Sequence, residues 1–190
     1  MKNKKLWIIL AVVAVLIIAI IASLASTYNG HVEKQAGVDQ KFAQVQTVLQ
    51  RRSDLIPNLV STVKGYAAHE ESVYTAIADA RAALSGAKTP EELSEANGEL
   101  DSAISRLLVV VENYPDLKAN ANFIALQDEL AGAENRISTE RGRYNEAVKE
   151  YNTAIKKFPN NIFAGMFGFT AADYFEADDE AQQVPEVNFD

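Results

Sequence analysis

The most apolar stretch of the sequence extends from Leu6 to Ala25, twenty apolar or small residues without a charge. At about 1.5 Å per residue, a helix of this length spans roughly 30 Å, the thickness of the hydrocarbon core of a bilayer. The stretch therefore predicts a transmembrane helix, with the lipid bilayer as a partner. The alternative is a cleaved secretory signal, because residues 23–25 resemble a cleavage site. Signal h-regions, however, usually have only about 7 to 15 residues.

Lysines precede the apolar stretch more densely than they follow it. Three lysines lie within residues 1–5, whereas only Lys34 and Lys41 come soon after Ala25. The positive-inside rule therefore predicts that residues 1–5 form a short basic cytoplasmic N-terminus. Residues 6–25 would cross the membrane, and the rest of the chain would lie on its outer face.

Beyond the span, apolar residues recur in alternating steps of three and four, the spacing of packed amphipathic helices. The pattern predicts a first helix that continues from the span through Leu49. It predicts a second helix from Ile56 to Leu84. Proline is tolerated near a helix start, so Pro57, preceded by the polar residues 52–54, predicts a tight reversal between these two helices.

Two further helices have clear boundary signals. Residues 89–92 (TPEE) combine a T-x-x-E capping box with proline at the first helical position, so a third helix begins at Pro90. It ends before Pro115, because the residue preceding proline is disfavoured in a helix. A fourth helix covers residues 123–158 and stops at the following proline. Four amphipathic helices with short links predict an all-α fold, an N-terminal transmembrane helix followed by an antiparallel up-down four-helix bundle.

Large apolar residues cluster after the fourth predicted helix. In an up-down bundle this helix descends toward the membrane, so the cluster arrives near the membrane surface. One interpretation is that these side chains fold back as a cap on the base of the bundle. The other is that some stay exposed and contact the membrane or a partner. The candidate contact residues are Phe163, Met166, Phe167 and Phe169.

Composition narrows the possible functions. The formal net charge is −8, and every ionisable residue in the tail at 170–190 is acidic, so a basic face for nucleic acid is missing. With no cysteine and two histidines, the chain supplies few ligands for a transition metal. The S-x-x-K sequence at residues 61–64 lacks the S-D-N and K-T-G motifs that accompany it in serine β-lactamases. We therefore expect a protein that is not an enzyme, needs no cofactor and binds no nucleic acid.

One charged residue interrupts the apolar stripe of the second predicted helix. Glu70 lies between Tyr66 and Val73, where a continuous seam would carry an aliphatic residue. Burial of an unpaired charge is costly, so we predict a buried polar network with a cation of the fourth helix. Arg141 faces inward, and Arg136 lies nearer the level of Glu70. The alternative is that Glu70 sits at the solvent edge of the stripe.

Three stretches carry a resemblance to a known family. They are residues 28–70 with LIPNLV at 55–60, residues 114–161 with Tyr-Asn pairs at 144–145 and 151–152, and VPEVNF at 184–189. Through these stretches the chain resembles the LemA family of bacterial membrane proteins over essentially its whole length. The resemblance implies an antiparallel helical bundle behind a single N-terminal span. It implies no catalytic chemistry.

The resemblance also bears on topology and partners. Family members have been predicted to place the main domain in the cytoplasm, opposite to the orientation that the lysines favour here, and we follow the charges. Family genes often neighbour envelope proteins such as membrane metallopeptidases, which implies an envelope partner. We expect a LemA-like bundle at residues 26–169 and an aromatic and acidic tail at 170–190.

The expected function is that of a non-enzymatic scaffold or interaction protein at the bacterial cell envelope. Its expected partners are the bilayer, an unidentified membrane or envelope protein, and a second copy of the chain in a homo-oligomer. The alternative is an accessory or regulatory subunit of a membrane hydrolase or other envelope enzyme.

Overall fold

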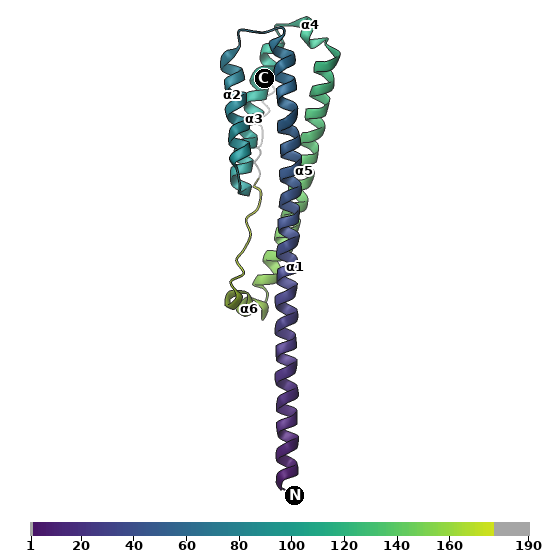
Figure 1. The fold of residues 1–190 in the computed structure, drawn as a ribbon, viewed down its shortest axis with the longest axis vertical. Helices are drawn as coiled ribbons and strands as arrows, with labels where there is room; N and C mark the ends of the chain where they lie inside the picture. The colour runs from purple at the N-terminus through teal and green to yellow at the C-terminus, as the bar shows by residue number, and fades with distance from the viewer. Residues whose placement is uncertain (1, 177–190) are drawn as a thin grey trace, which may run out of the picture. The chain divides into compact units, whose positions relative to one another are not determined.

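The computed structural model describes residues 2–176, which form helices and connecting loops (Figure 1). The helices are α1 (Lys2–Lys64), α2 (Glu71–Gly86), α3 (Pro90–Val111), α4 (Pro115–Lys118), α5 (Ala121–Lys156) and α6 (Asn160–Phe167). The predicted all-helical class is confirmed. Most of the predicted acidic tail, residues 177–190, lies outside the described residues.

Helix α1 is a single helix of 63 residues that includes the predicted span. Near its N-terminus it contains a stretch long and apolar enough to cross a membrane, and none of that stretch is buried within the protein. The helix passes without a break through residues 28–30. The first helix therefore continues from the apolar stretch, as the pattern predicts.

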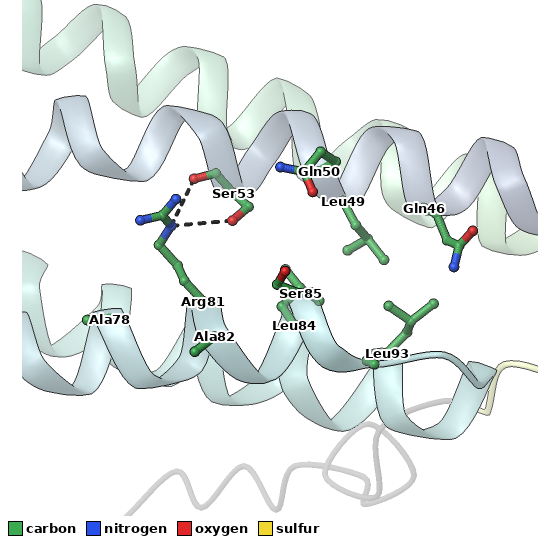
Figure 2. A pocket seen from close by; sticks show the side chains of 11 residues that line it. Gln46, Leu49, Gln50, Ser53, Ala78, Arg81, Ala82, Leu84, Ser85 and Leu93 are labelled. Carbon is green, nitrogen blue, oxygen red and sulfur yellow. Dashed lines mark hydrogen bonds between the residues drawn. The ribbon is translucent and has the colours of Figure 1, made fainter.

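The predicted reversal before Pro57 is wrong, because α1 continues through this proline to Lys64. Proline has no N–H, so the carbonyl of Ser53, four residues earlier, loses its helical donor. Arg81 of α2 replaces that donor: its Nε donates to the carbonyl oxygen of Ser53 at 3.1 Å and to Ser53 Oγ at 3.3 Å (Figure 2). The chain reverses instead at residues 65–70, and the predicted second helix is reduced to α2.

Contacts divide the described chain into two compact units. Unit 1 comprises residues 2–40 and 146–172, and unit 2 comprises residues 41–145 and 173–176. Helices α1 and α5 contribute residues to both units. The apolar stretch and α6 belong to unit 1, whereas α2, α3 and α4 belong to unit 2.

Unit 2 buries the apolar faces of α1, α2, α3 and α5. Its most deeply buried side chains include Leu49, Ile56, Leu59, Ile77, Leu100, Leu107, Phe123 and Ile137. Three contacts fix the relative direction of α1 and α5 within this unit. The ring of Phe42 lies 5.7 Å from that of Tyr144, Arg52 pairs with Glu134, and Tyr66 Oη accepts a hydrogen bond from Asn120. As the residue numbers increase along α1, the numbers of the residues they contact on the α5 side decrease. The two helices are therefore antiparallel here.

Helix α3 begins where the sequence predicts. Thr89 Oγ1 accepts a hydrogen bond from the N–H of Glu92 at 3.2 Å, which closes the predicted capping box. The Glu92 carboxylate in turn accepts from the N–H groups of Lys88 at 2.7 Å and Thr89 at 3.1 Å. These two backbone donors favour the ionised carboxylate and lower the pKa of Glu92.

The cap predicts a pH dependence at the start of α3. Because folding lowers the pKa of Glu92, the stabilisation is present above the unfolded-state pKa and is lost as pH falls through the folded-state pKa. After correction for intrinsic rates, we expect faster hydrogen exchange of the Lys88 and Thr89 amides on acidification through this range. Glu92→Gln should remove the pH dependence. An unchanged pH profile in that variant would contradict the assignment.

Candidate functional site

In unit 1, the aromatic residues that follow α5 pack against α1 just beyond the apolar stretch. The ring centroid of Tyr28 lies 5.1 Å from that of Phe167 and 5.6 Å from that of Phe169. The buried ring of His31 lies 5.3 Å from that of Phe169. Tyr28 and His31 are three and six residues past Ala25, which is about 4.5 and 9 Å along a helix. The aromatic cluster is therefore held within about two helical turns of the predicted span.

The four candidate contact residues fall into two groups. Phe163 and Phe169 are half-buried. Met166 and Phe167 are 74% and 47% exposed. Phe158 and Ile162 are also exposed, and we call these four exposed apolar residues of α6 and the turn before it the α6 face. The structure thus leaves part of this apolar cluster exposed, and both the cap and the contact with a membrane or partner stay predictions.

The structure does not bring Glu70 together with Arg136 or Arg141. Glu70 occupies the N-cap position of α2, where its side chain makes no cap hydrogen bond, and does not lie inside a long helix. Nearby Tyr66 accepts a hydrogen bond from Asn120, immediately before α5. Arg136 and Arg141 follow Asn120 by sixteen and twenty-one residues, which is about 24 and 32 Å along a helix. The prediction that Glu70 pairs with a cation of α5 assumed a helix boundary at residues 52–57, which the continuous α1 does not have.

A buried polar network in unit 2 is built around Arg52 instead. Arg52 is 4% exposed, and its Nη1 donates to Asn97 Oδ1 at 2.7 Å. The guanidinium also pairs with Asp101 through Nη2 and with Glu134 Oε2 at 2.7 Å from Nη1. Asn97 Nδ2 donates to Asp101 Oδ2 at 3.0 Å. The network links α1 to α3 and α5. We therefore assign it a structural role.

The Tyr-Asn pair at residues 144–145 binds the segment that follows unit 1 in the sequence. We call residues 173–176, which belong to unit 2, the resident segment. Asn145 Nδ2 donates to the carbonyl of Phe175 at 2.8 Å, and Asn145 Oδ1 accepts from the N–H of Phe175 at 2.9 Å. Tyr144 Oη donates to the carbonyl of Asp173 at 2.9 Å. All three hydrogen bonds join a side chain of α5 to a main-chain atom of the resident segment.

The second Tyr-Asn pair makes the same kind of contact within unit 1. Asn152 Nδ2 donates to the carbonyl of Ala172 and Asn152 Oδ1 accepts from the N–H of Ala172, both at 2.9 Å. Tyr151 is buried, and burial raises the pKa of its hydroxyl. From the sequence we predict no role for the side chains of these pairs. Their seven-residue separation was the available signal, because two helical turns place equivalent side chains on one face.

The side chain of Phe175 fills a pocket in unit 2. Its ring centroid lies 5.1 Å from that of Tyr144 and 6.2 Å from that of Phe42. The guanidinium of Arg141 lies over the ring at 5.3 Å, a cation–π distance. Phe175 is 5% exposed. We call Phe42, Arg141, Tyr144 and Asn145 the Phe175 pocket.

A groove of about 410 Å³ lies beside the Arg81 contact in unit 2 (Figure 2). Its polar lining consists of amides, hydroxyls and the guanidinium of Arg81, whose Nε is already bonded to Ser53. No carboxylate or histidine lines it. Among the residues that the structure describes, no cluster of three or more His, Cys, Asp or Glu side chains is placed to hold a metal. We assign the groove no chemistry.

Comparisons with known proteins agree with the resemblance read from the sequence. The model of the LemA family matches residues 41–189. Magnetosome protein MamQ 2 of Paramagnetospirillum magneticum is 30% identical over 88% of this chain and 70% of its own length. Magnetosome protein MamQ of Magnetospirillum gryphiswaldense is 26% identical, over 88% of this chain and 71% of its own length. Protein LemA of Metamycoplasma hominis is 23% identical, over 78% and 68% respectively. The extent of these matches shows that the chain belongs to the LemA family.

Proposed function

We propose that this protein is a membrane-anchored, non-enzymatic interaction protein of the bacterial cell envelope, with the α6 face resting on the bilayer surface. Its scaffold would be the helical part of the chain beyond residue 25. As the lysine distribution favours, residues 1–5 would be cytoplasmic and the scaffold would lie on the outer face. None of the relatives reported above carries the name of an enzyme, which agrees with a non-enzymatic role.

The observation that carries the proposal is the contact of Tyr28 with Phe167. The headgroup layer on each side of a bilayer is about 5 to 8 Å thick. Tyr28 lies about 4.5 Å past Ala25 along α1, so its ring falls within that layer if the apolar stretch fills the hydrocarbon core. Phe167 packs on that ring and belongs to the α6 face. Aromatic and apolar side chains at this depth are stabilised by the membrane interface.

Depth-dependent fluorescence quenching tests the proposal. The chain has a single tryptophan, Trp7, so Trp7→Phe provides a background without tryptophan. In that background we expect Met166→Trp, in the full chain reconstituted into vesicles, to be quenched by lipids brominated near the headgroup end of the acyl chain. Quenching by lipids brominated near the chain terminus should be weaker, because the α6 face lies at the surface.

Val109→Trp in the same background is the matched control. Val109 is 70% exposed, close to the 74% of Met166, but lies on α3. The proposal places only the α6 face on the bilayer, so the control should show little quenching by either lipid. Equal quenching of the two tryptophans, or none at Met166→Trp, would reject membrane contact by α6.

A further inference from the structure

The resident segment forms three hydrogen bonds through its backbone. Asn145 forms two hydrogen bonds with the N–H and C=O of one residue, and Tyr144 binds the carbonyl two residues earlier. Any extended chain presents these groups in the same way, whatever its side chains. The site therefore has the chemistry of a peptide-binding surface, in which main-chain hydrogen bonds supply affinity and a side-chain pocket supplies specificity.

Only one side chain of the resident segment is used for recognition. Phe175 is buried in the Phe175 pocket, whereas Asp173, Tyr174 and Glu176 are exposed. The pocket presents two aromatic rings and a guanidinium to this side chain. Such a lining favours an aromatic ring over an aliphatic side chain, through edge-to-face contacts and the cation–π interaction.

We propose that the Phe175 pocket is a binding site for an extended segment of a partner protein that carries an aromatic residue, and that the resident segment occupies it until such a partner displaces it. The resident segment is the pattern for such an occupant. It is a non-helical chain whose aromatic residue forms hydrogen bonds with Asn145 through both its N–H and its C=O. The inference rests on the proposed role as an interaction protein. It does not use the contact of α6 with the membrane, so either can fail without the other.

The resident segment belongs to the same chain as the Phe175 pocket, so a partner must compete with a tethered occupant. A tethered segment has an effective concentration of about the millimolar range, so a free peptide competes poorly with the unchanged chain. Phe175→Pro should open the site. This change removes the ring from the pocket and the N–H from Asn145, while every residue of the Phe175 pocket stays as it is.

A peptide-binding measurement with the full chain in detergent micelles tests the proposal. The probe is a fluorescein-labelled peptide of residues 171–176, AADYFE. We expect the Phe175→Pro chain to bind it at least about tenfold more tightly than the unchanged chain, because the tethered competitor is lost. Adding Asn145→Leu should weaken binding about tenfold, because two hydrogen bonds are lost. The matched control, Tyr174→Ala, alters an exposed neighbour of Phe175 and should bind like the unchanged chain.

The outcomes separate the possible occupants. If Phe175→Pro binds no more tightly than the unchanged chain, or if Asn145→Leu has no effect while circular dichroism shows full helix content, the proposal is rejected. A peptide with alanine in place of its phenylalanine should not bind, and equal binding of that peptide would reject the aromatic specificity. Concentration-dependent dimers of the unchanged chain that the peptide dissociates would overturn the assignment in favour of a second copy.

A second measurement keeps the proposal testable if Phe175→Pro fails to fold. The unchanged chain is exposed to a large excess of the peptide with benzoylphenylalanine in place of its phenylalanine, followed by illumination. We expect crosslinks at Phe42 or Tyr144, which contact the ring of Phe175. Crosslinks spread over the surface without these two residues would reject the pocket as the binding site.

Discussion

Replacing Arg52 with methionine is expected to lower the free energy of unfolding by about 2 to 4 kcal/mol. Removing one member of a buried ion pair commonly costs about 3 to 5 kcal/mol. Here Asp101 and Glu134 keep 42% and 44% of their side-chain surface exposed, so water recovers part of that cost. Buried Asn97 also loses the donor to its Oδ1. Denaturant unfolding of the full chain in detergent micelles, followed by circular dichroism, measures the change.

Arg51→Met is the matched control for this prediction. Arg51 precedes Arg52 in α1 and is exposed, so its loss changes the net charge equally without opening the network. An exposed substitution of this kind should change stability by less than about 0.5 kcal/mol. If the two variants are destabilised equally, the network does not stabilise the fold.

The second large effect concerns the passage of α1 through Pro57. Arg81→Met should cost about 1 to 3 kcal/mol, because the carbonyl of buried Ser53 then has neither a helical donor nor the guanidinium. Pro57→Ala restores an N–H four residues after Ser53. In that background Arg81→Met should cost at least about 1 kcal/mol less. The same unfolding measurement on the wild type, both single variants and the double variant gives the coupling.

A cost of Arg81→Met that is the same with proline and with alanine at position 57 would show that Arg81 does not substitute for the missing donor. Pro57→Ala alone should stabilise the chain or leave it unchanged, because a helix-interior proline is unfavourable. Destabilisation by that single variant would show that Pro57 has a packing role of its own.

The elements that depend on local chemistry were predictable from the sequence. The capping box at Thr89 and Glu92 involves residues three apart, so its spacing alone places the start of α3. The long apolar stretch in α1 is likewise a property of contiguous residues. By contrast, proline at position 57 is a helix breaker by local rules, and the donor that satisfies the carbonyl of Ser53 comes from α2.

The sequence interpretation of Arg52 and Glu70 depends on that one boundary. A reversal before Pro57 would place Arg52 in a turn and Glu70 inside a helical stripe. Once α1 is continuous, Arg52 lies three residues after Leu49 and four before Ile56, on the buried face of the helix. The residues that bind Arg52 lie on other helices. The sequence next to Arg52 therefore does not predict which residues they are.

The continuity of α1 past Ala25 has a mechanical consequence. No glycine-rich or proline-rich tether separates the apolar stretch from Tyr28 and His31, so rotation of the span about its axis carries the aromatic cluster with it. One residue inserted into the helix between Ala25 and Tyr28 would turn these two side chains by about 100° and shift them by about 1.5 Å. Seven inserted residues would nearly restore their azimuth but raise them by about 10 Å. The helix between the apolar stretch and Tyr28 therefore fixes both the height and the rotation of the aromatic cluster relative to that stretch.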